Sequence, residues 1–509
     1  MQTSLVAVLI SSFAAIPASA QEVPQTPPAL KSTLDKIIET EAFENSLWGI
    51  HVTDAATGRT LYSRNRQKSF IPASNVKLYV TATALSMLGP DYRYLTRLYA
   101  QNRPTSGGQL RGNLVVRGSG DPTIGKRFRP GDDRTALFRE WRDSLAAAGI
   151  RHMRGDIIGD DDVFDDVPFG EGWSWQDLTW WYAAEISGLS FNDNAVDLTV
   201  TPRRPDMPAT LSWKPFNTKY VEFTNQTRTV PASADYDESY DKKWGTNHFT
   251  VSSLLPVDDG DKEALSVTNP TRYFAFVFRE SLVRGGFAGR GEAVDVDELS
   301  FKPDYASDSL RRIAGHRSPP LNRIVQVTNR RSQNFYAEQL LKTIAAEEPL
   351  QPDDPLYEDE LEPGSSAMGW QAALPFLATT GIDTSRINLV DGSGLSRKNL
   401  VTPQMTAQLL RYMQSDAPGD SVRSAFYQSL AQPGIEGTLR NRFERGPAAA
   451  TVRAKTGTLS HVSALSGYVE DQRGRPLVFS IMVNHHTTDA DKVREAQDRI
   501  VNRLARYPN

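Results

Sequence analysis

The chain has 509 residues, of which 39% are hydrophobic and 23% charged, a composition typical of a globular protein. Its length predicts two or three domains. The net charge of −4 argues against a nucleic-acid partner, which usually needs a basic surface. The seven histidines are scattered and cysteine is absent, so we expect neither a metal centre nor disulfide bonds.

Residues 1–20 have the pattern of an export signal. A short apolar run over 5–15 is followed by Pro17 and by Ala18-Ser19-Ala20, which predicts cleavage before Gln21, although no Lys or Arg precedes the run. The run is too short to span a bilayer. We therefore expect an exported protein in a bacterial periplasm, where a chain without cysteine avoids mispairing.

The two ends of the chain have similar patterns of helices and strands. Near the amino terminus we expect a helix over 30–42, a hairpin of strands over 48–53 and 59–64, and an apolar helix from Ser74 to Leu88. Near the carboxyl terminus we expect strands over 462–470 and 476–484 and a helix over 488–506. That last helix is expected to pack on the sheet, which leaves at most a peripheral contact with a membrane.

The middle of the chain differs in composition, because it is rich in Thr, Val, Asp and Gly. We interpret residues 96–299 as an inserted β-rich region of two small domains. The flanking segments 21–95 and 300–509 then form one catalytic domain. The short strands expected in the insertion cover residues 110–117, 195–201, 209–214, 220–224 and 249–254.

Three short motifs follow one another along the chain: Ser74-Asn75-Val76-Lys77, Ser332-Gln333-Asn334 and Lys455-Thr456-Gly457-Thr458. Together they have the form S-x-x-K, S-x-N and K-T-G. Such a set builds a serine acyl-transfer site in which lysine moves the protons, without a metal or a cofactor. Each motif alone is weak, because short patterns arise by chance.

Ser74 is the candidate nucleophile and Lys77 its base. Residues three apart on a helix share a face, so Lys77 lies beside Ser74. Lysine accepts a proton only when neutral, so burial and a nearby cation, for which Lys455 is the candidate, must lower its pKa. The second S-x-x-K, Ser239-Tyr240-Asp241-Lys242, lies in an acidic stretch without an apolar helix behind it, which favours Ser74.

The other two motifs supply the remaining groups. Ser332 can pass a proton to the leaving group, and Asn334 can contact Lys77 and the substrate, although Ser and Asn are also common helix caps and Ser190-Phe191-Asn192 repeats the pattern. Lys455, with the hydroxyls of Thr456 and Thr458, suits a terminal carboxylate, and Gly457 lets a substrate backbone lie close. The backbone N–H groups of Ser74 and Thr458 are the expected oxyanion hole.

Longer stretches around these motifs resemble a known family, the D-alanyl-D-alanine carboxypeptidase/endopeptidases of the class C penicillin-binding proteins (penicillin-binding protein 4 type). The stretches are Phe70-Ile71-Pro72-Ala73-Ser74-Asn75-Val76-Lys77, Arg331-Ser332-Gln333-Asn334-Phe335-Tyr336-Ala337-Glu338, Asp391-Gly392-Ser393-Gly394-Leu395-Ser396, Gly437-Thr438-Leu439 and Arg453-Ala454-Lys455-Thr456-Gly457-Thr458. The resemblance implies an α+β fold, the serine transpeptidase-like fold of penicillin-recognising enzymes. This fold is an antiparallel sheet flanked by helices, with β-rich domains inserted between Ser74 and Ser332.

The resemblance also implies an activity. The D-Ala-D-Ala end of a peptidoglycan stem peptide, or a cross-link, would acylate Ser74, and water would release the product. β-Lactam antibiotics would acylate the same serine and leave slowly. The sequence leaves open the choice between carboxypeptidase and endopeptidase, the third stem residue (diaminopimelate or lysine) and the oligomeric state.

An aromatic segment is the candidate for substrate selection. It contains Trp173, Trp175, Asp177, Trp180, Trp181 and Tyr182. In the family the matching segment reaches the active site, so Asp177 and Arg397 would hold the ammonium and carboxylate of a diaminopimelate side chain, with Tyr182 on its methylenes. The alternative is that the tryptophans are core residues and Asp177 is a surface charge. Ser460 stands where some relatives carry an amide.

Two other functions remain alternatives. A serine β-lactamase of one type pairs Glu with Asn four residues later, after the S-x-N motif. Here only Glu41 and Asn45 have that spacing, and they precede Ser74. A non-catalytic cell-wall-binding relative would have lost a nucleophile or a base, whereas this chain keeps both.

Overall fold

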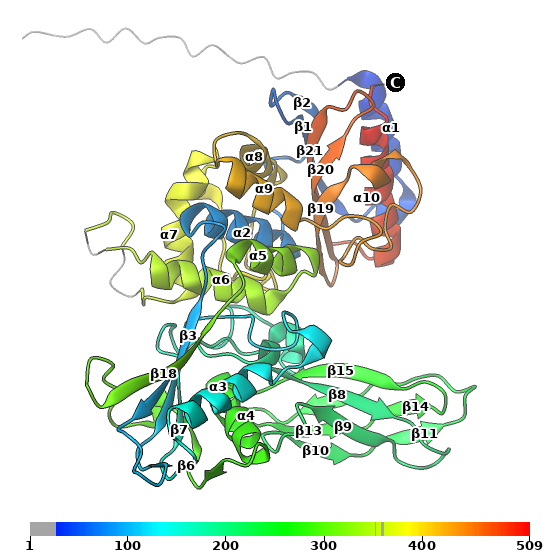
Figure 1. Ribbon diagram of the computed structural model, residues 1–509. Coiled ribbons are helices and arrows are strands. Elements are labelled where there is room, and N and C mark those ends of the chain that lie inside the picture. The colour runs from blue at the N-terminus through cyan, green and yellow to red at the C-terminus, as the bar shows by residue number, and fades with distance from the viewer. Residues whose placement is uncertain (1–26, 352, 358–360, 509) are drawn as a thin grey trace, which may run out of the picture.

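The computed structural model describes residues 27–351, 353–357 and 361–508 (Figure 1). The expected export signal, residues 1–20, lies outside these ranges. Among the helices within them, none combines the length and the apolar character needed to cross a membrane.

A five-stranded antiparallel sheet joins the two ends of the chain. Its strand order is β19-β20-β21-β1-β2, which leaves β19 at an edge. β1 and β2 form the expected hairpin, and β1 pairs along its whole length with β21. The strands are β1 (Leu47–Asp54), β2 (Thr60–Arg64), β19 (Arg453–Leu459), β20 (Val462–Glu470) and β21 (Pro476–Asn484).

Helices cover both faces of this sheet. α1 and α10 lie against each other on one face (Figure 1), where Leu34 and Ile500 share a core with Ile50 of β1. On the other face α8 packs on β1 and β21 and leads into a helical lobe. The helices are α1 (Pro28–Ile38), α2 (Val76–Met87), α5 (Leu321–Arg330), α6 (Asn334–Glu347), α7 (Ser366–Thr379), α8 (Pro403–Gln414), α9 (Asp420–Ser429) and α10 (Ala490–Ala505).

The middle of the chain contains a second five-stranded sheet, with the order β17-β7-β5-β3-β18. α4 packs on β7 and β17, and α3 packs on α4 and β18. These two helices, of 12 and 15 residues, accompany the many short strands of the expected β-rich region. The elements are β3 (Leu95–Gln101), β5 (Leu114–Arg117), β7 (Ile157–Asp160), β17 (Ala293–Asp295), β18 (Leu310–Arg317), α3 (Ala136–Ala147) and α4 (Pro270–Arg284).

Small sheets extend from this region as an elongated arm (Figure 1). The expected strand over 195–201 has those bounds as β8, and the strands expected over 209–214, 220–224 and 249–254 lie within a few residues of β9, β10 and β13. The strand expected over 110–117 is divided into β4 and β5, which belong to different sheets. The sheets are β15-β8-β9, β10-β13-β12 and β11-β14, and a further sheet, β16-β6-β4, lies beside α4. The strands are β4 (Gln109–Leu110), β6 (His152–Met153), β8 (Ala195–Thr201), β9 (Thr210–Lys214), β10 (Glu222–Asn225), β11 (Arg228–Val230), β12 (Tyr240–Lys242), β13 (His248–Val251), β14 (Leu254–Pro256), β15 (Asp261–Ser266) and β16 (Ala288–Gly289).

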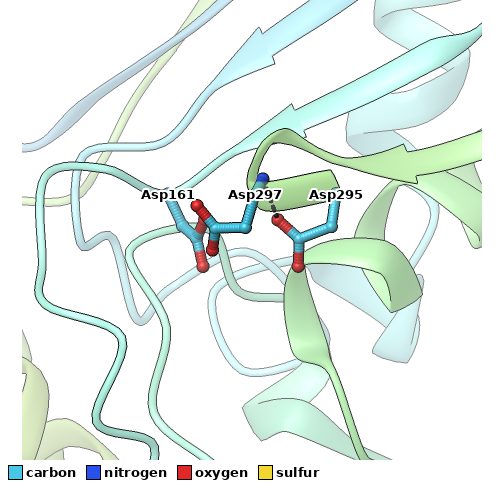
Figure 2. A group of neighbouring side chains, drawn as sticks. All are labelled: Asp161, Asp295 and Asp297. Carbon is cyan, nitrogen blue, oxygen red and sulfur yellow. Dashed lines mark hydrogen bonds between the residues drawn. The ribbon is translucent and has the colours of Figure 1, made fainter. Parts of the chain in front are cut away.

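A group of three carboxylates lies beside this second sheet (Figure 2). Asp161 follows β7, Asp295 ends β17, and the backbone N–H of Asp297 donates to Asp295 at 3.2 Å. One oxygen of each carboxylate lies within 4.8 Å of the others. Burial and the nearby Asp295 raise the pKa of Asp161 to about 7, so this group favours a proton in the folded state.

The chain passes between the helical lobe and the middle region through β3 and β18 (Figure 1). These strands pair antiparallel, with Leu95 opposite Arg317. The expected boundary between residues 299 and 300 would separate β18 from its partner strand, so the pairing favours a boundary after Arg317. The division into a catalytic domain and two inserted domains stays a prediction.

Candidate active site

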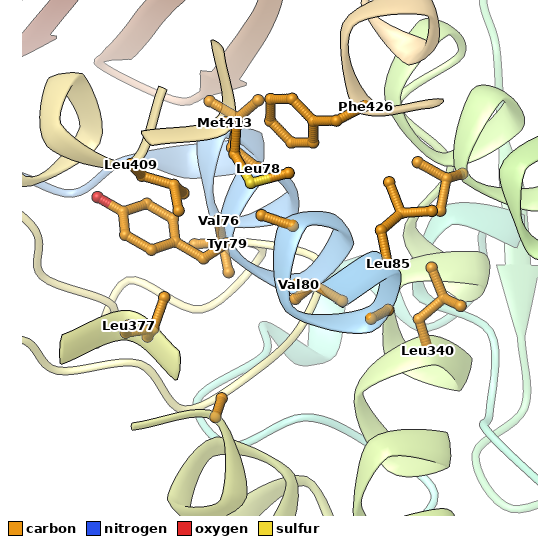
Figure 3. Close-up of a cluster of buried hydrophobic side chains, with 14 of the residues drawn as sticks. Val76, Leu78, Tyr79, Val80, Leu85, Leu340, Leu377, Leu409, Met413 and Phe426 are labelled. Atoms are coloured by element: carbon orange, nitrogen blue, oxygen red, sulfur yellow. The ribbon is translucent and has the colours of Figure 1, made fainter. Parts of the chain in front are cut away.

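α2 lies at the centre of the helical lobe and positions the S-x-x-K motif. Every residue from Val76 to Leu85 is buried. In Figure 3 its side chains point outwards in several directions, towards residues of α6, α7, α8 and α9, among them Leu340, Leu377, Leu409 and Phe426. A helix surrounded on all sides by apolar neighbours is a rigid element. Ser74, two residues before the first residue of α2, is therefore attached to a fixed support.

Ser74 lies in a tight turn, η2 (Ala73–Asn75), between α2 and the edge strand β19. Ala73 has a φ of 47°, a left-handed conformation that is costly for a residue with a side chain. The buried Asn75 amide donates to the backbone carbonyl of Lys455 at 3.2 Å. This contact joins the first motif to the third.

Lys77 connects the first motif to the second. Its Nζ donates to Ser74 Oγ at 2.9 Å, to Asn334 Oδ1 at 2.7 Å and to the backbone carbonyl of Ser393. Burial lowers the pKa of Lys77 to about 7, although the nearby Asp391 and Glu338 oppose the shift. The expected fall in pKa therefore comes from burial rather than from the charge of Lys455.

Lys455 connects the third motif to the second. Its Nζ donates to Ser332 Oγ at 2.7 Å and to the carbonyl of Thr456 at 2.7 Å. Burial and the charge of Lys77 hold the pKa of Lys455 well below its ordinary value. Each lysine thus holds one serine hydroxyl, and the two serines stand in the same cleft.

Asn334 is fixed on both sides of its amide. Its Oδ1 accepts from Lys77, and its Nδ2 donates to the backbone carbonyl of Tyr182 at 2.7 Å. The contact with Lys77 is the expected one. The contact with Tyr182 ties the S-x-N motif to the aromatic segment of the middle region.

Gly457 and Gly394 bring β19 and the 391–394 loop against the Ser74 turn. A Cβ on Gly457 would lie 2.7 Å from the carbonyl of Pro72, and one on Gly394 would lie 2.1 Å from that of Ala73. Gly457 thus allows close approach of the protein's own backbone, whereas the sequence suggested approach of a substrate. Both glycines set the position of Ser74.

The cleft has a volume of about 550 Å³ and opens above the two lysines. Seven of the expected site residues line it: Ser74, Ser332, Asn334, Thr458, Asp177, Tyr182 and Arg397. Lys77 and Lys455 are buried beneath it, and Thr456 and Gly457 line an adjoining hollow that shares Thr458. The three motifs therefore meet in one cleft with Asp177, Tyr182 and Arg397, the candidate residues for substrate selection.

The candidate selection residues form two hydrogen-bonded pairs in the cleft wall. Tyr182 Oη donates to Asp177 Oδ1 at 3.0 Å, and Arg397 Nη2 donates to the carbonyl of Ser460 at 2.6 Å. Burial and Asp177 raise the pKa of Tyr182, so its hydroxyl remains a donor. The tryptophans of the segment diverge: Trp173 donates to Asp391 at 2.9 Å, whereas Trp175 is 61% exposed.

The second copies of the motifs lie in other surroundings. Ser239 contacts Ser252, and Lys242 lies on strand β12 and donates to Ser266. Ser190 donates to the carbonyl of Ser187. No contact joins Ser239 to Lys242 among the described residues, so these copies do not repeat the arrangement around Ser74.

Comparison with known proteins agrees with this geometry. Residues 30–507 match the D-Ala-D-Ala carboxypeptidase 3 (S13) family. The chain belongs to this S13 family. The D-alanyl-D-alanine carboxypeptidase of Actinomadura sp. (strain R39) is 34% identical to it over 94% of this chain and 85% of the relative.

Solved structures support the S13 fold. The crystal structure of penicillin-binding protein 4 (dacB) from Haemophilus influenzae superposes with a TM-score of 0.76 at 22% identity, over 94% of this chain and 99% of that one. The same protein complexed with a β-lactam gives a TM-score of 0.70 at 21% identity, with the same coverage. The expected fold, a penicillin-recognising antiparallel sheet flanked by helices, is confirmed.

The carboxylates of Glu338 and Asp391 lie in this S13 site, although the sequence analysis gave them no role. Glu338 accepts from the backbone N–H groups of Gly392 and Ser393, at 2.9 and 2.7 Å, and so fixes the loop whose carbonyl receives Lys77. Burial, together with Asp391, raises the pKa of Glu338 to about 7. The spacing in the sequence could have indicated this residue. Glu338 stands four residues after Asn334, so the two side chains share one face of an apolar helix.

Proposed function

We propose that this protein hydrolyses D-alanyl-D-alanine peptide bonds in peptidoglycan through an acyl-enzyme on Ser74. The observation that carries the proposal is the pair of contacts at the buried Lys77, whose Nζ lies 2.9 Å from Ser74 Oγ and 2.7 Å from Asn334 Oδ1. A neutral amine at that place is a base for the serine hydroxyl. Membership of the S13 family supplies the substrate class.

Acylation begins with Lys77 neutral and Lys455 charged. Lys77 takes the proton of Ser74 as Oγ bonds to the carbonyl carbon of the penultimate D-alanine. The backbone N–H groups of Ser74 and Thr458 stabilise the oxyanion. Ser332 then gives its proton to the leaving nitrogen and takes one from Lys455, whose Nζ is 2.7 Å away. The C–N bond breaks, and one positive charge has moved from Lys455 to Lys77.

The low pKa of Lys455 supports this proton path. The charge that Lys77 gains lowers the pKa of Lys455 further, so each transfer favours the next. Deacylation reverses the path with water in place of the leaving amine. Ser332 passes the water proton to Lys455, and Lys77 returns its proton to Ser74 Oγ as the ester bond breaks.

The cleft wall supports recognition of two substrate groups. Lys455 and the hydroxyls of Thr456 and Thr458 bind the terminal carboxylate next to the scissile bond. Asp177 and Arg397 bind the ammonium and carboxylate of a diaminopimelate side chain, and Tyr182 packs on its methylenes. All three residues line the cleft together with Ser74.

β-Lactams acylate the same serine in this proposal. The H. influenzae relative of the same fold has been solved with a β-lactam bound. No observation in the described residues favours a β-lactamase instead, since Glu41 and Asn45 lie on α1's side of the sheet, near Phe43 and Trp48, outside the cleft lining. Action on peptidoglycan also supports export of the chain to the periplasm after cleavage of residues 1–20.

Fluorescent penicillin tests the nucleophile. We expect the wild type and Ser239→Ala to be labelled at equal rates and Ser74→Ala to remain unlabelled, because Ser74 has the buried Lys77 as its base, whereas Lys242 donates to Ser266 rather than to Ser239. Equal labelling of wild type and Ser74→Ala would disprove the assignment. Rapid steady-state hydrolysis of penicillin by the wild type would favour the β-lactamase alternative.

Purified muropeptides test the substrate. After incubation, mass spectrometry of monomeric pentapeptides should show the loss of one alanine, and cross-linked dimers should convert to monomers if the protein also acts as an endopeptidase. Ser74→Ala is the matched control. A wild type that changes neither substrate would contradict the proposed activity.

A further inference from the structure

Two tryptophans lie against each other on the surface of the protein. Trp175 is 61% exposed and Trp244 is 66% exposed, and their ring centroids are 5.6 Å apart with a tilt of 43° between the planes. They come from distant parts of the sequence. We call these two side chains the tryptophan pair.

The tryptophan pair adjoins the cleft. Trp175 begins a short turn, η4 (Trp175–Asp177), and its neighbours Ser174, Gln176 and Asp177 all line the cleft. Trp244 stands in the turn between β12 and β13. The pair is therefore one of the contacts between the cleft wall and the arm of small sheets.

The backbone around the tryptophan pair is fixed. The N–H of Ser266 on β15 donates to the carbonyl of Thr179 at 3.0 Å, and Trp180 forms a β-bridge with Leu265. The Trp180 ring also packs against Tyr240 of β12, with centroids 5.7 Å apart. The segment that carries Trp175 is thus joined to β15 by backbone contacts and to β12 by the Trp180 ring, and Lys242 of β12 donates to Ser266 of β15 at 3.3 Å. These contacts hold both ends of the pair, so the pair is a preformed surface.

Exposed indole faces favour a ligand with apolar faces and polar edges. A large exposed aromatic surface beside a cleft marks a binding site, and tryptophan combines a broad apolar face with an N–H donor. The residues next to the pair in the sequence, Gln176, Lys243 and Gly245, are polar or small, whereas the core of a stable protein interface is a continuous apolar surface. A pyranose ring has the matching chemistry, with C–H groups on its faces and hydroxyl groups at its edges.

The direction in which a stem peptide would lie in the cleft also leads to a sugar at the tryptophan pair. A stem peptide is cleaved at its carboxyl end and joined to the sugar at its amino end. With the scissile bond at Ser74 and the third residue at Asp177 and Tyr182, the remaining residues and the sugar continue past the η4 turn. We propose that the tryptophan pair binds the N-acetylated sugar that carries the stem peptide. The proposal rests on the proposed function, because that function sets the direction of the peptide.

The test compares a pentapeptide that carries its disaccharide with the same pentapeptide without it. In the wild type, the disaccharide should raise kcat/KM about tenfold, mainly through KM. In Trp244→Ala this ratio should fall towards one. Phe301→Ala removes an aromatic ring that is 90% exposed outside the cleft lining, and should keep the wild-type ratio. A wild-type ratio of one, or an unchanged ratio in Trp244→Ala, overturns the proposal.

A second measurement separates this proposal from the proposed function. Calorimetric titration of the peptide-free disaccharide needs no hydrolysis, and binding should be present in the wild type and lost in Trp244→Ala. Hydrolysis of neither peptide would contradict the proposed function, and the titration would still decide on the sugar site. Altered self-association of Trp244→Ala in sedimentation, with disaccharide binding unchanged, would assign the pair to a protein contact and overturn the proposal.

Discussion

Gln333 Nε2 donates a hydrogen bond of 3.0 Å to Asp193 Oδ2 and ties the middle residue of the S-x-N motif to the middle region of the chain. Asp193 is also paired with Arg127, whose Nη2 lies 2.6 Å from the same oxygen. Asp193 has a φ of 56° and Ser332 a φ of 57°. Such left-handed backbone persists only where surrounding contacts fix it, so each side of this contact supports the other.

Removal of the Gln333 amide should slow acylation. We expect Gln333→Ala to reduce the rate of acylation by penicillin about tenfold, because the loop that carries Ser332 loses its fixed position. The Arg127–Asp193 pair remains, so the loss of stability should be about 1–2 kcal/mol. Stopped-flow labelling and thermal unfolding measure the two effects.

Gln339→Ala is the matched control for that variant. Gln339 is also buried, and its Nε2 donates to the carbonyl of Ser187 at 3.0 Å and to Ser190 Oγ at 2.9 Å. It should lose a similar amount of stability and keep the wild-type acylation rate. If both variants acylate equally slowly, the Gln333 contact has only a general structural role.

The pKa of Lys77 predicts the pH dependence of acylation. The base is active when neutral, so the rate should rise with pH through about 7, far below the ordinary range of lysine. Glu338 favours the charged form of Lys77, so Glu338→Gln should move the midpoint to lower pH. The second-order rate of penicillin labelling between pH 5 and 9 gives both curves. A wild-type rate that is still rising steeply at pH 9, as for a lysine of ordinary pKa, would contradict the lowered pKa of Lys77.

A methyl group on Gly394 should disrupt the site. The added Cβ would lie 2.1 Å from the carbonyl of Ala73 and 3.0 Å from the backbone nitrogen of Ser74. We expect Gly394→Ala to acylate about a hundredfold more slowly. Gly381→Ala is the control, because its φ of 85° matches the 82° of Gly394, while its nearest neighbour is 3.6 Å away. Unchanged acylation in Gly394→Ala would contradict the close packing described.

The raised pKa of Asp161 predicts a stability change with pH. The folded state keeps this proton up to about pH 7, whereas an unfolded aspartate loses it near 3.9. The free energy of unfolding should therefore fall as pH rises from about 4 to about 7. Asp161→Asn removes this contribution, so it should stabilise the protein at pH 8, by up to about 4 kcal/mol, and little at pH 4.

Denaturant unfolding at both pH values measures this effect. The buffer should contain EDTA, because the three neighbouring carboxylates could hold a cation. Asp143→Asn removes a carboxylate whose side chain is 71% exposed, and should change stability by less than about 0.5 kcal/mol at either pH. A gain for Asp161→Asn that is equal at pH 4 and pH 8 would rule out the titration as its cause.

Local patterns predicted the elements that depend on neighbours in sequence. The bounds of β20 and β21 agree residue for residue with the expected strands, because their apolar runs end at clear turn signals. The S-x-x-K motif could be placed at the start of a buried helix for the same reason. The family resemblance added the fold and brought Asp177 and Arg397 into consideration.

Long-range contacts could not be predicted in this way. Nothing in the sequence near Gln333 indicates Asp193, and nothing near Gly457 indicates that its neighbour is the backbone of Pro72 and Ser74. Of the two expected causes of the low Lys77 pKa, burial has the largest effect, and the charges that act on Lys77 are those of Asp391 and Glu338, which oppose the shift. Burial depends on the packing of α2 among several helices, which no single segment encodes.

The pairing of Leu95 with Arg317 has a consequence for deletions in this chain. Because the chain enters and leaves the middle region on adjacent strands, a single deletion at this crossing would remove residues 96–316 as one piece. A short linker could close such a deletion. Such a deletion would nevertheless remove Asp177 and Tyr182, which line the cleft, and Asp193, which holds Gln333, so substitutions on the two sides of this crossing are constrained by each other.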